Sequence, residues 1–385
     1  MAIVFSKDIS EAKLLMAFNN NIVEFASNTA GKVPLNCIVL GLGINATLYP
    51  LPDGTFYFNF MEWISTVINT KNFNDDLITD LVNADESTFT YDVKEGCFLD
   101  GNVNFKVNFT DTTSENINRN IKFIAGAENL ETYKKNEMII ADSNYLVLSP
   151  VADQSNNTTF LKYWEGYPFE FSFFTNFPVD DFKLKNLTNG LDYTFTAKAK
   201  VTAVYLSDGR TDVTIEDFLP LVNGMNTIRI EYDGDLQDNI IQLHKEDAQC
   251  GIYLKWLNKY GRYNYWLFKD NHFRTRSSRY STELANDFYN LDETTSPTLQ
   301  SQKNTQDTLK IIAERLTLRD KIVLEGIIES PKVWMFTGER YAKANPTDWL
   351  EVTLKTTSFP IIKTDMNIYK FETEIEPPQR YSQTL

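Results

Sequence analysis

The sequence predicts a mainly β protein, built from several antiparallel β-sandwich modules with a few short helices. The chain of 385 residues is longer than one ordinary domain of ~150 residues. Hydrophobic residues make up 42% and charged residues 23%, which is the composition of a folded chain. Apolar and polar residues alternate with a period of two over several runs, and turn-forming pairs such as Asn189-Gly190 separate them. We expect three domains, with boundaries near 144/145 and 270/271.

The first predicted domain, residues 1–144, combines strands with short helices. Residues 102–109 alternate Asn or Lys with Val or Phe, which predicts a strand with one buried face. Apolar residues spaced by three and four predict helices over 60–68 and 77–82. These elements give the domain a β-rich fold with helical caps.

A glycine pattern in the same domain resembles a dinucleotide-binding loop. The run Gly41-Leu42-Gly43-Ile44-Asn45-Ala46 follows an apolar stretch, as such a loop requires. The loop must then open a helix, which Pro50 and Pro52 cannot continue. We therefore predict a hairpin or a bulge and no cofactor site.

The second predicted domain, residues 145–270, contains the longest alternation. From Tyr193 to Tyr205 the odd-numbered residues are apolar, which predicts one strand of ~44 Å. Asp208-Gly209 and Asp233-Gly-Asp235 follow as turn signals. The second of these lacks the distal glutamate of a calcium loop, so we expect a hairpin turn there.

The third predicted domain, residues 271–385, is either α+β or a β-sandwich. Its polar stretch 277–308 is interpreted as a long loop or a linker. Thr317 with Asp320 three residues later predicts the start of a helix over 319–329. Alternation over 350–354 predicts a further strand.

Charge restricts the partners of this chain. It has 37 Lys and Arg against 52 Asp and Glu, a formal charge of -15. Such a field repels nucleic acid and anionic membranes, so we expect neither as a partner. The longest uncharged stretch, 33–52, contains prolines that a membrane helix does not tolerate, and residues 1–18 lack the pattern of a secretory signal. We therefore expect a soluble protein made in the cytoplasm.

Residues for catalysis and metal binding are scarce. The chain has two histidines and three cysteines, and the cysteines are far apart. We interpret the cysteines as buried apolar side chains and His244 as a structural residue. No Gly-x-Ser-x-Gly, His-Glu-x-x-His or phosphate-binding loop occurs in the sequence. We predict no catalytic residue, no metal site, no cofactor and no enzymatic activity.

One segment, residues 255–280, differs from the rest because it is basic and aromatic. It is predicted to begin with a hairpin of strands 252–257 and 262–268 around Gly261. Three interpretations are open: an aromatic core with a solvated basic face, a contact with an acidic neighbouring subunit, or stacking on glycan or nucleic acid. The candidate subunit-interface residues are Lys255, Lys259, Arg262, Arg274, Arg276 and Arg279. The candidate glycan-stacking residues are Tyr260, Tyr263 and Tyr265.

Several short pieces of the chain suggest a family. The run from Ile252 to Phe268, with Trp256-Leu-Asn258, Gly261 and Tyr265-Trp266, resembles an aromatic hairpin of tail proteins from bacteriophages infecting Bacteroidetes. Further pieces resemble that family in the same order; they are 18–25, 53–60, 160–169, 329–335 and 350–358.

The resemblance implies a non-enzymatic structural protein of the virion tail, located at the baseplate, distal tail or tail tip. It implies a homo-oligomer that also assembles with other tail proteins, and it implies no catalytic residues. The alternative hypothesis is a carbohydrate-binding β-sandwich protein that contacts a host-surface glycan. A third hypothesis, a glycoside hydrolase of the tail, requires two carboxylates in one cleft.

Overall fold

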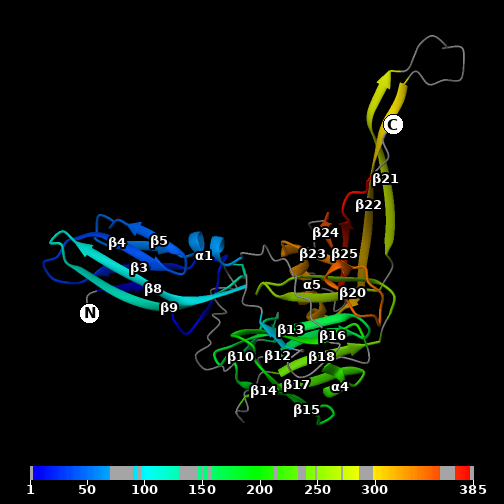
Figure 1. The fold of residues 1–385 in the computed structure, drawn as a ribbon, viewed down its shortest axis with the longest axis horizontal. Helices are drawn as coiled ribbons and strands as arrows, with labels where there is room; N and C mark the ends of the chain where they lie inside the picture. Colours follow the sequence, from blue (N-terminus) through cyan, green and yellow to red (C-terminus); the bar gives the residue numbers. More distant parts are fainter. Residues whose placement is uncertain are drawn as a thin grey trace, which may run out of the picture. The chain divides into compact units, whose positions relative to one another are not determined.

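The computed structural model describes residues 3–69, 90–92, 97–129, 145–149, 151–153, 158–210, 215–232, 240–247, 249–269, 272–285, 298–355 and 369–381. Strands form most of these residues, and most strand pairs are antiparallel. The predicted class is confirmed: the protein is mainly β, with several antiparallel sandwich modules and a few short helices (Figure 1).

The chain separates into two compact units. Unit 1 comprises Met1–Asp247, Leu257–Asn264 and Arg340–Pro346, and unit 2 comprises Ala248–Trp256, Tyr265–Glu339 and Thr347–Leu385. The three predicted domains stay a prediction, because both boundaries adjoin or fall on residues outside the described ranges. The predicted helix 77–82 and the turn 233–235 also lie outside them.

The first sandwich of unit 1 packs two sheets through phenylalanine rings. The smaller sheet has the order β1 (Ile3–Lys7), β3 (Ile22–Ser27), β6 (Phe56–Asn59). The larger sheet has the order β2 (Leu14–Met16), β9 (Ser114–Ile124), β8 (Phe98–Phe109), β4 (Pro34–Gly41), β5 (Ile44–Leu48). Phe25 of β3 and Phe105 of β8 meet with ring centres 5.2 Å apart. The predicted strand 102–109 and the predicted helix near 60–68, α1 (Met61–Val67), are both confirmed.

The glycine pattern forms the predicted hairpin between β4 and β5. Gly41 pairs with Ile44, and Leu42 and Gly43 between them have φ of 51° and 77°. Two successive positive φ angles are typical of a type I′ turn. A Cβ at Gly41 would lie 2.1 Å from the carbonyl oxygen of Asn102, so only glycine fits there.

The second sandwich of unit 1 also has two sheets. One has the order β10 (Tyr145–Val147), β13 (Pro168–Thr175), β16 (Val201–Asp208), β7 (Thr90–Asp92). The other has the order β11 (Val151–Asp153), β12 (Thr158–Trp164), β18 (Ile240–Glu246), β17 (Gly224–Tyr232), β14 (Asp181–Asn186), β15 (Asp192–Thr196). Phe173 of β13 contacts Phe182 and Phe195 of the second sheet, with ring centres 5.3 and 5.6 Å away. A short helix, α4 (Ile215–Phe218), lies between β16 and β17 in the chain.

The single long strand predicted from Tyr193 to Tyr205 is wrong. The run is two strands, β15 and β16, which belong to different sheets. Lys198 and Ala199 lie between the two strands, and their backbone N–H groups donate hydrogen bonds to the hydroxyl of Thr202 in β16. These bonds stabilise the segment where the chain passes from one sheet to the other. β16 is buried on both faces, so its odd-numbered residues up to Tyr205 are apolar as well and the pattern does not mark the break.

Unit 2 is centred on a seven-stranded sheet. Its order is β20 (Tyr263–Phe268), β19 (Ile252–Leu257), β23 (Val333–Phe336), β24 (Trp349–Leu354), β25 (Tyr369–Glu376), β22 (Thr298–Leu316), β21 (Phe273–Ala285). A single 3-10 turn, η4 (Pro346–Asp348), precedes β24. Helix α5 (Leu318–Glu329) contacts β22 and β25, and Thr317 and Asp320 form its capping box, as predicted.

The predicted loop or linker over 277–308 is wrong. The described residues of this stretch belong to β21 and β22, which pair antiparallel from Phe273 with Lys310 to Ala285 with Thr298. We call β21 together with residues 298–310 of β22 the arm; it is the yellow and orange ribbon in Figure 1. A two-stranded ribbon in solvent has no buried face, so its polar composition resembles that of a loop.

Candidate functional site

The basic and aromatic segment divides between two hairpins. β19 and β20 form the predicted hairpin, and Gly261 lies in its turn with φ of 68°. Almost every residue of these strands is buried, whereas all 13 residues of β21 are exposed. The six candidate interface cations therefore fall into two groups. Lys255, Lys259 and Arg262 belong to the buried hairpin, and Arg274, Arg276 and Arg279 belong to the arm.

The positive charges of the first group interact with other residues of the same chain. Lys255 is buried, and its ammonium lies 4.3 Å from the ring centre of Trp349. The ammonium of Lys259 lies 2.8 Å from a carboxylate oxygen of Glu128. Burial lowers the pKa of Lys259, but Tyr260 and Glu128 outweigh that effect and raise the pKa.

Arg262 is the most completely paired of the three. It is buried, and it donates a hydrogen bond of 2.7 Å to Glu170 and another of 2.9 Å to the hydroxyl of Ser172. A desolvated charge requires such partners. The charges of Lys255, Lys259 and Arg262 are thus engaged within the chain, which does not favour the predicted subunit-interface role for these three residues.

The three tyrosines predicted to stack on glycan do not form an exposed platform, because two of them are buried. Tyr260 and Tyr265 are only 4% and 7% exposed, and burial raises the pKa of the Tyr260 hydroxyl. Tyr265 stacks on Tyr253, with ring centres 5.9 Å apart. Tyr263 is half-buried, and the guanidinium of Arg262 lies 5.2 Å from its ring centre. For Tyr260 and Tyr265, the alternative of an aromatic core is confirmed.

Two residues of the second group, Arg274 and Arg276, gather around one carboxylate. Arg274 and Arg276 donate hydrogen bonds of 2.6 and 2.7 Å to opposite oxygens of Asp307, which lies directly across from Arg276 in the ladder. Arg380 approaches the same carboxylate at 3.3 Å. Asp307 is only 3% exposed, while the three guanidiniums keep much of their surface in solvent. Hydrogen bonds from Arg276 and Arg274 hold the pKa of Asp307 far below its usual range.

This cluster leaves positive charge on the surface of the arm. Three guanidiniums share one carboxylate, so two positive charges are uncompensated within the cluster. Arg279 is exposed further along β21. Of the candidate cations, Arg274, Arg276 and Arg279 are thus the ones whose surface a partner can reach.

The arm also exposes large apolar side chains and backbone. Phe273 and Tyr280 are each 59% exposed, and Leu284 and Leu299 are exposed as well. Among the described strands, β21 pairs with β22 alone and forms the edge of the sheet. An exposed edge of this length is a template for pairing with another chain.

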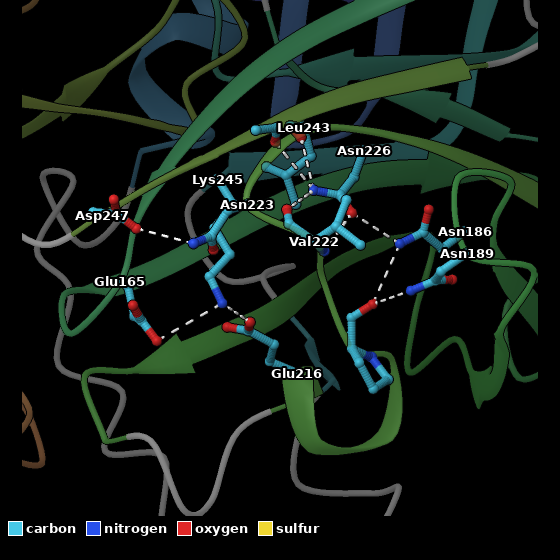
Figure 2. A network of polar contacts seen from close by, with 12 residues as sticks. Glu165, Asn186, Asn189, Glu216, Val222, Asn223, Asn226, Leu243, Lys245 and Asp247 are labelled. Atoms are coloured by element: carbon cyan, nitrogen blue, oxygen red, sulfur yellow. Dashed lines mark hydrogen bonds and ion pairs between the residues drawn. The ribbon is translucent and has the colours of Figure 1, made fainter.

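A different polar cluster lies in the second sandwich of unit 1. Figure 2 shows the ammonium of Lys245 between Glu165 and Glu216, in contact with Glu216 and 3.8 Å from Glu165. Burial raises the pKa of Glu216 and also that of the nearby Tyr163 hydroxyl. Because Lys245 lies on β18 and Glu216 on α4, the pair fastens the helix to the sheet. We interpret the cluster as structural.

A glycoside hydrolase requires two carboxylates in one cleft, and one groove within the described residues offers more than two. Asp180, Asp181 and Glu231 line an open groove of about 520 Å³ beside β14 and β17. Asp180 accepts a hydrogen bond of 2.6 Å from Tyr232, and Asp181 accepts one of 2.7 Å from Thr196. Both aspartates are thus engaged by neighbouring hydroxyls, and the groove is a weaker candidate than the arm.

The cysteines lie apart, and none forms a disulfide. Cys37 and Cys97 are buried as predicted, and burial raises the pKa of Cys37 to about 12. Cys250 is exposed, so the prediction is wrong for that residue. Within the described ranges, no group of three or more His, Cys, Asp or Glu residues could hold a metal ion, and no helix is long and apolar enough to cross a membrane.

Comparisons with known proteins add little to this description. No family model and no curated protein matches the chain. Fibronectin(III)-like modules of Clostridium thermocellum CbhA match 64% of this chain and 95% of their own, at 5% identity and a TM-score of 0.18. A tetra-tandem repeat from the extending region of a large adhesion protein matches 97% of this chain and 73% of its own length, at 11% identity and a TM-score of 0.23. The I9–I11 tandem of titin matches 64% of this chain and 66% of its own length, at 8% identity and a TM-score of 0.18.

Proposed function

We propose that this protein is a non-enzymatic structural component of a phage tail that binds neighbouring subunits through its arm. The observation that carries the proposal is the exposed arm, a long edge strand with cations and aromatic rings on its surface. The resemblance of the aromatic hairpin to phage tail proteins supports the location in the virion tail. The partners are further copies of this chain and other tail proteins.

Three properties of the arm favour an intermolecular contact. Its backbone edge can extend a sheet of another subunit, which is a common mode of assembly. Its exposed residues are of the types that carry binding energy in interfaces, aromatic rings and arginines. Within the arm, β21 and residues 298–308 of β22 pair only with each other among the described strands. This pairing contributes little to the core of unit 2, so the length of the arm requires a reason other than stability.

Charge favours an acidic partner surface. In residues 273–285 and 298–310, five basic side chains stand against two acidic ones, whereas the whole chain has a net charge of -15. A second copy of this chain therefore offers the arm a surface of opposite charge. Such a contact weakens as salt concentration rises.

The test removes the outer part of the arm, residues 278–305, and keeps the base of the arm, residues 273–277 and 306–310. Ser277 pairs with Gln306, so replacing residues 278–305 by Asn-Gly closes the hairpin in register through a two-residue turn. The cluster around Asp307 is retained. We expect light scattering of the full chain to show oligomers that salt dissociates, and we expect the shortened chain to associate at least about tenfold more weakly.

Circular dichroism and thermal unfolding of the shortened chain provide the folding control. We expect both to match the full chain, because the removed part of β21 is exposed throughout. The same mass distribution for both chains would contradict the role of the arm. A full chain that is monomeric at every concentration and salt would contradict self-assembly through the arm and leave only other tail proteins as its partners.

A further inference from the structure

The outer face of the five-stranded sheet in the first sandwich is unusually rich in amides. The side chains that point away from the core on β4, β5, β8 and β9 include eight asparagines. They are Asn36, Asn45, Asn102, Asn104, Asn108, Asn116, Asn118 and Asn120. We call this set the amide face. All eight residues are exposed or half-buried, and they alternate with more buried residues such as Cys37, Val103, Phe105, Val107 and Ile121.

Strand register arranges the amide face in rows. Asn118 of β9, Asn104 of β8, Leu40 of β4 and Asn45 of β5 lie side by side across four strands. Asn108 likewise lies beside Asn36. At standard strand spacings, the rows cover an area of about 14 by 20 Å.

Two amide pairs hold the side chains in place. Asn104 donates a hydrogen bond of 2.6 Å to Asn118, and Asn108 donates one of 2.7 Å to Asn36. An amide has two donor hydrogens and an acceptor oxygen, so each pair retains donors and acceptors for a ligand. The face therefore presents positioned groups of both kinds.

Strand stability does not explain this composition. Asn is among the residues depleted from strands, and Thr or Val would suit the same exposed positions better. Eight asparagines on one face thus stand against local propensity. Conflicts of this kind between local preference and fold are expected at functional sites.

The charges of the face determine which ligand fits. In a chain with a net charge of -15, the strand residues in the rows of Asn102, Asn104, Lys106 and Asn108 include no carboxylate and one cation, Lys106. At the end of these rows the carboxylate of Glu11 accepts a hydrogen bond of 3.3 Å from the backbone N–H of Asn120. One cation is too few for a nucleic acid backbone, and amides rather than apolar side chains make up most of these rows. Paired donors and acceptors without charge suit the hydroxyl groups of a neutral sugar chain.

We propose that the amide face binds a neutral polysaccharide. Amides of β8 and β9 hydrogen-bond to sugar hydroxyls, and a sugar ring stacks on Tyr49, which follows β5 and is 74% exposed. This site is separate from the buried tyrosines of the β19–β20 hairpin. The proposal does not rest on the function of the arm, and each can fail alone.

The test uses native gels that contain a neutral polysaccharide. The panel is dextran, mannan, xylan and a mixed-linkage β-glucan, and we expect at least one of them to retard the chain. The variant combines Asn116→Thr, Asn118→Thr and Asn120→Thr, which removes three exposed amides from β9. We expect its affinity to fall at least about tenfold, or about 1.4 kcal/mol, because three amides that can bond to sugar hydroxyls are lost.

Thr was chosen for these three positions so that a loss of binding can be distinguished from a loss of folding. Because Thr favours strands, the triple variant should melt at the same temperature or higher, and lost retardation would not reflect unfolding. Asn20→Thr, at an exposed position of the first sandwich outside both the amide face and the arm, is the control and should be retarded as before.

Three results would overturn the proposal. One is the absence of retardation by every polysaccharide of the panel. Another is equal retardation of the triple variant and the unchanged chain. The third is a triple variant that loses only self-association in light scattering, which would make the amide face a contact between copies.

Discussion

The hairpins at the two edges of the seven-stranded sheet differ in burial although their sequences are alike. The β19–β20 hairpin and the arm both mix basic residues with aromatic ones. In the first hairpin the rings are core and the cations have partners within the chain. In the arm, Phe273 and Tyr280 are exposed and three guanidiniums share one carboxylate.

The difference shows that the same residue types can serve stability or recognition, depending on the depth of the strand. A buried arginine must be paired, so Arg262 contributes to the stability of the fold through its ion pair with Glu170. Its buried guanidinium is not accessible to a partner molecule. An exposed arginine contributes little to stability and keeps its charge for binding. Substitutions in the two hairpins should therefore separate folding from assembly.

The largest effect is expected from Arg262→Met. This change leaves the buried carboxylate of Glu170 without its guanidinium, at a cost of about 3–5 kcal/mol. Urea unfolding monitored by tryptophan fluorescence measures the loss. The matched arm variant Arg276→Met should leave the urea midpoint unchanged, because Arg274 and Arg380 still contact Asp307.

A second variant checks the cause of that loss. Arg262→Met combined with Glu170→Gln removes both buried charges, so most of the stability should return. Equal midpoints for Arg262→Met and Arg276→Met would show that burial does not distinguish the two hairpins.

The next effect is expected from Gly261→Ala in the turn of the buried hairpin. The residue has φ of 68°, and a Cβ there would lie 2.0 Å from the carbonyl oxygen of Ala125. The positive φ costs about 1–2 kcal/mol and the overpacking about 1–3 kcal/mol. Thermal unfolding should show a clear decrease in Tm.

Gly190→Ala separates the two contributions. Gly190 has φ of 79°, but nothing lies within 4 Å of its Cβ position. This control should lose only about 1–2 kcal/mol, from φ alone. If Gly261→Ala and Gly190→Ala lowered the Tm by the same amount, the close packing of the hairpin turn against Ala125 would be refuted.

Local patterns in the sequence predicted many of the elements. The β19–β20 hairpin, the β4–β5 hairpin and the capping box of α5 each depend on residues close together in the chain. Such features follow from turn chemistry, alternation and capping. The mainly β class follows from the same patterns.

The parts that the sequence did not predict depend on distant residues. Arg262 and Glu170 are 92 positions apart, so no local pattern shows that the arginine is compensated. The arm is polar on both faces, and only the pairing of β21 with β22 makes it a ribbon. The amide face was missed because its rows join β4, β5, β8 and β9, although the alternate asparagines of 102–108 and 116–120 were a visible signal.

A smaller effect is expected from Arg279→Glu, and on assembly alone. Arg279 is exposed near the middle of β21, so reversing its charge should leave the Tm unchanged. Association should weaken about tenfold, or about 1.4 kcal/mol, if the arm binds an acidic surface. Sedimentation or light scattering at low salt measures the change.

Lys7→Glu is the matched control for that variant. It makes the same change of net charge at an exposed position of β1. Equal weakening by both substitutions would indicate general repulsion between acidic chains, and the arm would lose its specific role.

The smallest effect concerns pH and the base of the arm. Because the arginines hold the pKa of Asp307 far below that of an unfolded aspartate, about 3.9, the carboxylate stays ionised in the folded chain throughout mildly acidic conditions. Its contribution to stability is fully present above about pH 3.9 and is lost only as pH falls towards the lower folded value. Amide hydrogen exchange of residues 274–277, corrected for the intrinsic effect of pH, should therefore show equal protection at pH 7 and pH 5. Asp307→Asn should reduce that protection at both pH values, whereas a loss in the unchanged chain between pH 7 and pH 5 would mean that the arginines do not hold this carboxylate ionised.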